Sequence, residues 1–348
     1  MGTRRLISSP VGPGSTLPSL DAAEAAARAG RRVLLVLPDR SARARARREL
    51  ACRLSRGPAP VLFDPRSISS LSGLARRILR QEAPRLASAR ERDAFLAHAL
   101  AELPGPDAGL ALRYRGFRRG LLGVFSELES NGLGERDLAR RLRWARLDPQ
   151  RAGRLHSAYE GYRQRLRGGG QPGRRRRGPL LATESDLLRQ ATRKLKAWEQ
   201  AEGAGRILPQ VLLCDGFNDL SPCQREFLGA LALQVEEVEL RWPAGDLEAL
   251  AYAWPDAARE ALLEQGFSEE RREPEPDSRP TALRRLASEL YQPTSDPLPP
   301  EQCEGLRIVR AASREDEADV ALAQARAWRR GEPAPGERAR RWSDVLIV

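Results

Sequence analysis

The chain has 348 residues, of which 41% are hydrophobic and 30% are charged, a composition typical of a globular protein. No apolar run approaches the ~20 residues of a membrane-spanning helix, and Met1–Pro10 lacks the apolar core of a secretory signal. The four cysteines form no CxxC pair and there are only two histidines, so a zinc site is not expected. These features predict a cytoplasmic protein with reduced thiols, no metal site and no membrane partner.

The net charge of +12 and the pI of about 10.5 point to a polyanionic partner, of which nucleic acid is the most common. Nearly all the basic residues are arginines, since Lys194 and Lys196 are the only lysines. GC-rich coding produces the same bias, so codon usage is an alternative source of part of this charge.

The first part of the chain alternates strand and helix signals. Val33–Leu37 has the unbroken apolar character of a buried strand and ends at Pro38. Asp39–Leu54 continues as an arginine-rich amphipathic helix, and Pro60–Phe63 is a candidate second strand. Ser67–Leu79 begins with serines that favour a helix N-cap and becomes helical.

From about residue 80 to about 202, apolar residues recur at helical spacing and no strand is predicted. This stretch contains a glycine-rich basic segment, 167–179, which includes Arg174, Arg175, Arg176 and Arg177. Such a segment is either a solvated insertion or a contact for phosphate groups.

The most informative segment is Val211–Leu231, in which four apolar or small residues lead directly into Asp215. A buried parallel strand delivers a carboxylate to the C-terminal edge of a sheet in this way. Ser221 and Pro222 then provide the N-cap and the first residue of a helix. Val235–Leu240 alternates as another strand of the same parallel sheet.

The remaining chain divides into two parts. Residues 244–303 form a polar, proline-rich connection that we expect to hold two short helices, and residues 304–348 have a β-α-β pattern. The chain stops inside the last apolar strand, Val345–Val348, which suggests a truncated or unusually short sequence.

Taken in order, these pieces resemble the N-terminal half of AddB, a subunit of AddAB helicase–nucleases in the UvrD-type superfamily. Asp215-Gly216-Phe217 is similar to the family's remnant of the second nucleotide-binding motif. Ser67–Leu79 is similar to a segment that contacts single-stranded DNA in related helicases, and Ser70, Ser72 and Leu74 fall on it. Further similarities cover Val33–Asp39 with Arg48–Leu50, Arg118–Leu133, Ile308–Trp328 and Trp342–Val348.

The resemblance implies an α/β fold, with the RecA-like parallel sheet of a UvrD-type helicase, a large helical insertion and the start of a second α/β domain. Residues 1–79 and 203–243 would form helicase domain 1A, and 80–202 would form the helical insertion domain 1B. Residues 244–303 would be linker helices, and 304–348 would begin domain 2A.

The nucleotide-binding motif departs from the family. Working members carry G-x-x-x-x-G-K-[ST] near the start, where backbone N–H groups and a lysine hold phosphates. Here Gly12, Gly14, Ser15 and Thr16 preserve a degenerate loop without the lysine, and Pro13 removes one N–H group. The acidic pair after the buried strand is reduced to Asp215-Gly216, which lacks the carboxylate that would orient water.

We therefore expect a helicase-like subunit, or the N-terminal part of one, with no catalytic residues and no cofactor of its own. The family's ATP, magnesium and iron–sulfur cluster belong to motifs that are degenerate or missing here. Its expected partners are single-stranded DNA and an AddA-like helicase–nuclease subunit, in double-strand-break repair by recombination. The alternatives are a weak ATPase that uses Ser15, Thr16 and Asp215, and a structural partner of an acidic protein. Trp144, Tyr159 or Trp198 could stack bases, although their helical spacing favours core positions.

Overall fold

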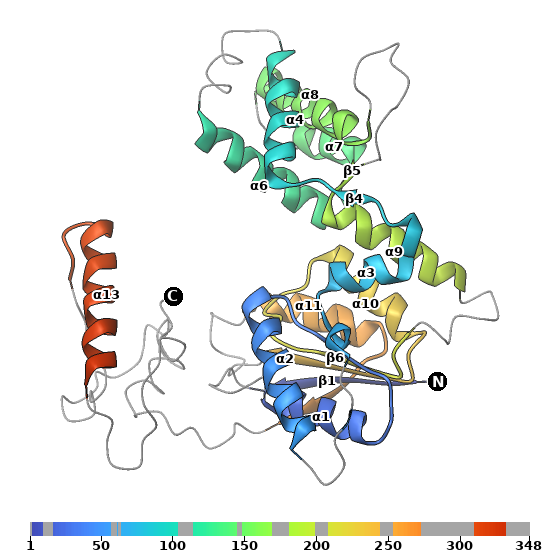
Figure 1. Ribbon diagram of the computed structural model, residues 1–348. Helices are drawn as coiled ribbons and strands as arrows, with labels where there is room; N and C mark the ends of the chain where they lie inside the picture. The colour runs from blue at the N-terminus through green and yellow to red at the C-terminus, as the bar shows by residue number, and fades with distance from the viewer. Residues whose placement is uncertain are drawn as a thin grey trace. The chain divides into compact units, whose positions relative to one another are not determined.

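The computed structural model describes residues 2–9, 17–56, 61, 64–103, 114–144, 148–168, 181–198, 208–243, 253–272 and 310–331. The chain forms two compact units, residues 1–277 and 278–348. The first unit contains a sheet with helices on both faces and a separate group of helices (Figure 1). In the second unit, the described residues form one helix, α13 (Arg314–Arg330).

The central sheet has six strands in the order β3-β2-β6-β7-β1-β8, and every pairing in it is parallel. The strands are β1 (Thr3–Ser9), β2 (Val33–Val36), β3 (Ile68–Ser69), β6 (Val211–Cys214), β7 (Glu237–Pro243) and β8 (Ser268–Arg271). The predicted parallel sheet that contains residues 33–37, 211–214 and 235–240 is therefore confirmed, and the chain has the predicted α/β class.

Strand β2 shows why this sheet is covered on both sides. Leu34 and Val36 belong to one buried core, whereas Leu35 belongs to the other, because successive strand residues point to opposite faces. In β6, Leu212 and Leu213 divide between the two cores in the same way. Two apolar faces require two layers of helices, which is the reason for a three-layer arrangement.

Helices α1 (Leu17–Arg28) and α2 (Arg40–Ser55) contribute to the core of one face. The core of the other face includes residues of α3 (Leu71–Leu79), α9 (Glu184–Trp198), α10 (Pro222–Ala232) and α11 (Ala253–Glu264). Asp39 caps α2 by accepting a hydrogen bond from the N–H of Ala42 at 2.7 Å. Short 3₁₀ turns lie at Pro65–Ser67 and Arg80–Glu82.

A helical bundle is formed by α4 (Ala89–Ala101), α6 (Arg115–Ser130), α7 (Glu135–Trp144) and α8 (Pro149–Leu166). It has its own core, in which the ring of Phe125 lies 4.8 Å from that of Tyr159 and 5.6 Å from that of Tyr162. Tyr159 is therefore a core residue and does not offer a free ring for base stacking. Trp198 is partly buried against the core of the sheet.

The bundle is joined to the sheet through a short parallel pair, β4 (Arg85–Leu86) with β5 (Leu181–Ala182). The expectation that residues 80–202 contain no strand is therefore wrong. Helix α9 also falls inside that range, yet its apolar residues, such as Leu187 and Leu195, belong to the core of the sheet. The described helices of the bundle span residues 89–166, and α9 returns the chain to the sheet.

Three strands of the central sheet, β1, β3 and β8, are not among the predicted ones, and β3 occupies Ile68–Ser69, where the sequence indicates the start of a helix. β1 lies between β7 and β8, although its sequence contains Arg4 and Arg5, and β8 is the polar edge strand Ser-Glu-Glu-Arg. Within the stretch 244–303, for which linker helices are expected, β8 is an edge strand of the sheet and α11 contributes Ala258 and Leu262 to the core on one of its faces. The strands expected at 60–63, 306–309 and 345–348 lie outside the described residues, apart from Val61, which is not in a strand.

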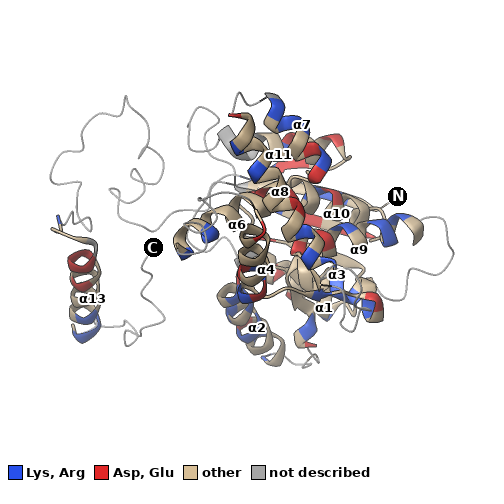
Figure 2. Cartoon of the chain, turned by 90° about the horizontal axis from the view of Figure 1, so that it is seen from above, with Lys and Arg blue, Asp and Glu red and all other residues tan. Residues whose placement is uncertain are grey.

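Charged side chains of both signs occur on most of the helices (Figure 2). None of the helices in the described ranges combines the length and the apolar character needed to cross a membrane. Among the described residues, Cys52, Cys214 and Cys223 are free cysteines.

Candidate nucleotide and nucleic-acid site

Because all strands of the central sheet are parallel, the loops that follow them open onto one edge. Asp215 directly follows β6, and Ser70 directly follows β3, so both predicted residues lie at this edge. β1 ends at Ser9 and α1 begins at Leu17, so both ends of the predicted nucleotide loop are attached here. Gly12, Gly14, Ser15, Thr16 and the four arginines at 174–177 themselves lie outside the described residues.

Asp215 is buried with an incomplete set of partners. Asp215 is only 3% exposed, and its Oδ1 accepts a hydrogen bond from the N–H of Gly216 at 2.6 Å. The buried hydroxyl of Ser19, at the start of α1, also interacts with the carboxylate. Oδ2 is buried and accepts no hydrogen bond from the part of the chain that the structure describes. Burial is the main effect on this group and raises the pKa of Asp215.

Charged residues of β7 lie beside Asp215. Cys214 pairs with Leu240, so Asp215 and Arg241 occupy the next positions on two neighbouring strands. The charge of Arg241 lowers the pKa of Asp215 and that of Glu239 raises it, although both effects are smaller than burial. Arg241 donates a hydrogen bond to Glu239 at 2.8 Å, and Arg5 of β1 contacts the same carboxylate at 3.3 Å. Asp215 thus has one guanidinium group nearby, that of Arg241, which is itself paired with Glu239.

These residues fit a magnesium ion only in part. Magnesium is usually held by one or two carboxylates together with substrate phosphates. Asp215 offers one free oxygen, but Arg241 supplies positive charge nearby. Among the described residues, no group of three or more His, Cys, Asp or Glu side chains could hold a metal ion.

Gly216 stands where the related motif has its second carboxylate, and its backbone explains the change. Its φ of +76° lies in the left-handed region, which side chains other than glycine adopt only with strain. A Cβ atom here would lie 3.6 Å from Cδ of Pro38, so the strain comes from the backbone and not from a clash. A glutamate at this position would therefore be disfavoured in the present loop conformation.

Ser70 and Ser72 lie at the first turn of α3. The Oγ of Ser70 accepts a hydrogen bond from the N–H of Gly73 at 3.1 Å, which caps the helix. The two hydroxyl oxygens lie 3.2 Å apart, and both residues are half-buried. Their position at the C-terminal edge agrees with the prediction, but the local role of Ser70 is helix capping.

Some arginines of the basic helix α2 hold the sheet edge together. Arg43 donates hydrogen bonds to the carbonyl oxygens of Leu37 and Pro38, at 2.9 and 2.6 Å. Arg47 does the same for Pro65 and Ile68, at 3.1 and 2.7 Å. Carbonyl groups at the end of β2 and beside β3 are thereby satisfied. Part of the positive charge in the sequence is thus used within the fold.

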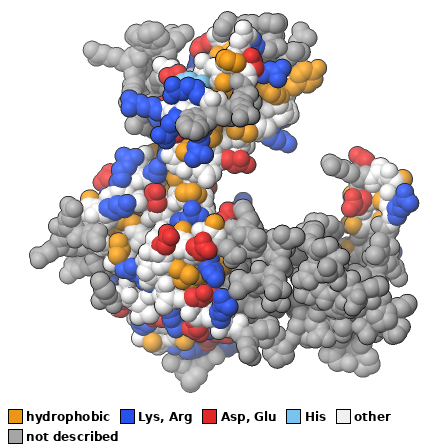
Figure 3. All heavy atoms as spheres, turned by 180° about the vertical axis from the view of Figure 1, so that it is seen from behind, with side chains coloured by type: hydrophobic (Ala, Val, Ile, Leu, Met, Phe, Trp, Pro, Cys, Tyr) orange, Lys and Arg blue, Asp and Glu red, His pale blue; other side chains and the backbone are white. Residues whose placement is uncertain are grey.

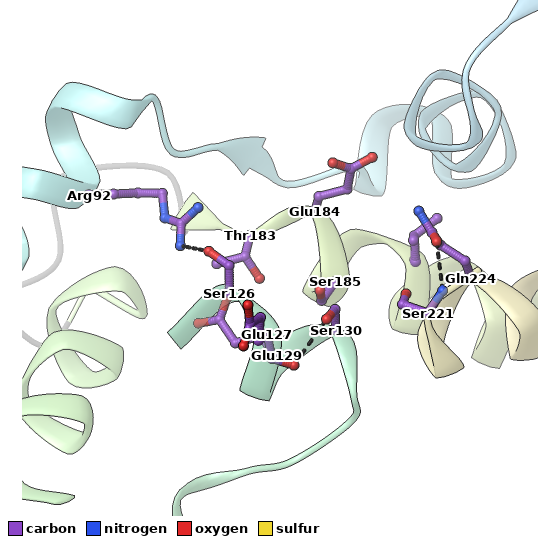
Figure 4. A pocket seen from close by; sticks show the side chains of 11 residues that line it. Arg92, Ser126, Glu127, Glu129, Ser130, Thr183, Glu184, Ser185, Ser221 and Gln224 are labelled. Atoms are coloured by element: carbon purple, nitrogen blue, oxygen red, sulfur yellow. Dashed lines mark hydrogen bonds between the residues drawn. The ribbon is translucent and has the colours of Figure 1, made fainter. Parts of the chain in front are cut away.

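A polar pocket of about 340 Å³ lies between the bundle and the first turns of α9 and α10 (Figure 4). Among the described residues that line it, Arg92 is the only basic one, and it donates to Ser126 and to the hydroxyl of Tyr162, both at 2.8 Å. The acidic lining residues are Glu127, Glu129 and Glu184. This excess of negative charge disfavours phosphate groups, so the pocket is not a site for a nucleic-acid backbone. Its residues come from separate segments, which is why no sequence motif indicated it.

Comparisons with known proteins do not assign this geometry to a family. The sequence matches no protein-family model, and no curated protein is significantly similar to it.

Proposed function

We propose that this chain is a helicase-like protein that does not hydrolyse ATP and that binds single-stranded DNA. It would serve as a scaffold beside an AddA-like helicase–nuclease subunit. The observation that supports this most strongly is the shared sheet edge. The end of β1 and the buried Asp215 after β6 both lie at it, and only β7 lies between these two strands. The helical bundle is inserted between β3 and β6, where a domain-sized insertion is expected from the family resemblance.

Three features argue against turnover. The expected phosphate loop has no lysine, Gly216 replaces a carboxylate, and Arg241 supplies positive charge near Asp215. Phosphoryl transfer depends mainly on positioning and on charges aimed at the transition state. Loss of one such electrostatic group costs on the order of 3–4 kcal/mol in activation free energy. Two losses in the same site would make hydrolysis too slow to drive translocation.

The net charge of +12 supports a nucleic-acid partner, because contacts between arginine and phosphate release counterions. The test is fluorescence anisotropy of a labelled oligothymidylate over a range of NaCl concentrations. We expect log affinity to fall linearly with log salt, with a slope of about −0.7 for each phosphate contact. An absence of salt-sensitive binding would instead favour a scaffold for an acidic protein.

The arginines at 174–177 offer a local version of this test. Replacement of all four by serine should weaken binding and flatten the salt slope. A matched control replaces four exposed arginines of α7 by serine: Arg136, Arg140, Arg141 and Arg143. If both variants lose the same affinity, binding depends on net charge and not on the segment.

The second candidate is a weak ATPase, which is favoured by the buried Oδ2 of Asp215, an atom without a hydrogen-bond partner among the described residues. It predicts Mg–ATP binding and DNA-stimulated phosphate release, both lost in Asp215→Ala. We expect no detectable turnover from the unmodified chain. Robust turnover that disappears in Asp215→Ala would contradict the non-hydrolysing scaffold.

A further inference from the structure

Helix α6 of the bundle exposes aromatic side chains at its N-terminal end. Tyr114, its N-cap residue, is 63% exposed and Phe117 is 56% exposed, whereas Phe125, about two turns further along the same helix, is fully buried in the core of the bundle. In the described part of residues 1–277, Tyr114 and Phe117 are the most exposed large hydrophobic side chains. Exposed aromatic groups beside polar ones mark interaction sites, because aromatic rings are normally buried. In Figure 1 this end of α6 extends away from the other helices.

Three arginines, Arg115, Arg118 and Arg119, lie in the same turns of α6 as these rings, and one of them is paired with a carboxylate. Arg118 binds Asp93 through two hydrogen bonds, at 2.9 and 3.0 Å. The exposed Arg115 and Arg119 form no ion pair within the described ranges, although both also attract Asp93 at longer range. Three arginines therefore surround one carboxylate, and two of them remain available to an anionic ligand. Figure 3 shows hydrophobic and basic side chains adjoining at this end of the bundle.

Glycines separate the two kinds of side chain. With about 3.6 residues per turn, Gly116, Gly120 and Gly123 lie between Phe117 on one edge of the exposed face and Arg119 on the other. A Cβ atom built on any of these glycines would meet no atom of the described chain within 4 Å. Glycine weakens a helix relative to alanine, and no contact in the described chain requires it here. Close approach of an external ligand to the helix backbone would explain these glycines.

Single-stranded nucleic acid fits this combination better than the alternatives. Its bases present free faces for stacking on aromatic rings, and its phosphates pair with arginine. Duplex DNA hides those faces, and a glycine strip alone would also suit a partner helix. The exposed Arg115 and Arg119 favour the polyanion.

We propose that the exposed N-terminal end of α6 binds single-stranded DNA. This surface, here called the α6 platform, consists of Tyr114, Arg115, Phe117, Arg119 and Gly120. Bases stack on Tyr114 and Phe117 across the glycine strip, and phosphates contact Arg115 and Arg119. This assignment rests on the proposed single-strand binding and names the surface that performs it.

The first experiment separates stacking from charge. Affinities are measured for an oligothymidylate and for an abasic oligonucleotide of equal length, which has phosphates but no bases. Phe117→Ala and Tyr114→Ala should each weaken oligothymidylate binding about 5- to 100-fold, the range of stacking on one base. Neither change should affect the abasic oligonucleotide. Leu233→Ala, which truncates another exposed apolar side chain, is the matched control and should change neither affinity.

The second experiment tests the two arginines of the platform through the salt dependence of binding. Arg115→Ser with Arg119→Ser should weaken binding of both oligonucleotides and reduce the salt slope by about 0.7 for each phosphate group that is no longer bound. The matched control is Arg136→Ser with Arg140→Ser on α7, which should leave the slope nearly unchanged. An oligonucleotide that carries 5-iododeoxyuridine should photocrosslink to Tyr114 or Phe117, as located by mass spectrometry of the digested adduct.

Three outcomes would overturn the assignment. If the unmodified chain binds oligothymidylate but the aromatic variants bind equally well, DNA binds elsewhere and only the α6 platform fails. If the unmodified chain binds no single strand, both the platform and the proposed function fail. If light scattering shows a dimer that Gly120→Leu dissociates, the face serves a second copy of the chain.

Discussion

Arg163 of α8 donates two hydrogen bonds to the carboxylate of Asp186 on α9, at 2.9 and 2.8 Å. A third bond, at 3.0 Å, connects the same guanidinium to Glu129 of α6. The side chains of Arg163 and Glu129 are almost completely buried. Because α6 and α8 belong to the bundle and α9 packs on the sheet, this cluster fixes one part of the molecule to the other.

Arg163→Ala should destabilise the protein by about 3–5 kcal/mol, because it leaves the buried carboxylate of Glu129 and the half-buried one of Asp186 without their cation. The free energy of unfolding is to be measured by urea denaturation followed by circular dichroism. Arg140→Ala is the control, since Arg140 pairs with Asp137 in an exposed position on α7 and its removal should cost less than about 0.5 kcal/mol. Equal effects of the two changes would contradict a structural role for the buried cluster.

Stability should fall in acid through Asp186. Burial opposes ionisation of this carboxyl, but the hydrogen bonds and charge of Arg163, with the contacts of Thr183, outweigh it and lower its pKa to about 2. A depressed pKa means that the folded state binds this proton more weakly than the unfolded state does. The contribution is therefore complete above the unfolded value of 3.8 and is lost as the pH falls towards about 2.

The measurement is the free energy of unfolding at several pH values between about 5 and 2, for the unmodified chain and for Asp186→Asn. The difference between them should shrink as the pH falls. Glu129 titrates in the opposite sense, since burial raises its pKa, and it remains in both proteins. A pH-independent difference would show that Asp186 does not act through its charge.

Two glycine-to-alanine changes should have opposite effects on the stability of the folded protein. Gly216→Ala should destabilise by about 1–2 kcal/mol, because the φ of +76° is unfavourable for a residue with a Cβ atom. Gly120→Ala, in a helix with open space around it, should stabilise by about 0.5–1 kcal/mol. Thermal unfolding of both variants checks the pair, and a stabilising Gly216→Ala would mean that this loop has another conformation in solution.

Asp215→Asn should leave stability unchanged or increase it at pH 7. The asparagine retains an oxygen for the N–H of Gly216 and removes a buried charge that lacks a full set of partners. Thermal shift with and without Mg–ATP is the measurement. If Mg–ATP raises the melting temperature of the unmodified chain but not that of Asp215→Asn, Asp215 serves a nucleotide and the weak ATPase gains support.

The strands that the sequence predicts are those with a continuous or alternating apolar pattern. β2 and β6 are buried on both faces, so their residues are apolar without interruption. β1 carries Arg5, whose charge is neutralised by Glu237 and Glu239 of β7, and such compensation by a distant segment leaves no local pattern. β8 is a polar edge strand, for which the alternation of hydrophobic residues gives no signal.

The candidate site likewise combines a residue that a local sequence pattern identifies with residues that only the fold brings to it. Asp215 is recognisable because it follows a buried strand, whereas Ser19 and Arg241 become its neighbours only through folding. For α9 the helical spacing predicts a helix, and Thr183 and Asp186 form reciprocal capping contacts at its start. It does not predict that this helix packs on the sheet, because helical periodicity identifies an apolar face but not the surface that the face covers.

Helix α6 connects the proposed platform with the first turn of α10. Its exposed end carries Tyr114 and Phe117, and at its other end the carbonyl oxygen of Glu129 lies 3.4 Å from the thiol of Cys223 in the first turn of α10. At a rise of about 1.5 Å per residue, α6 spans about 24 Å as one stiff rod. The loop that carries Asp215 leads directly into α10. A force applied to the outer end of α6 would therefore be transmitted along the helix to α10, which follows the loop of Asp215 in the chain.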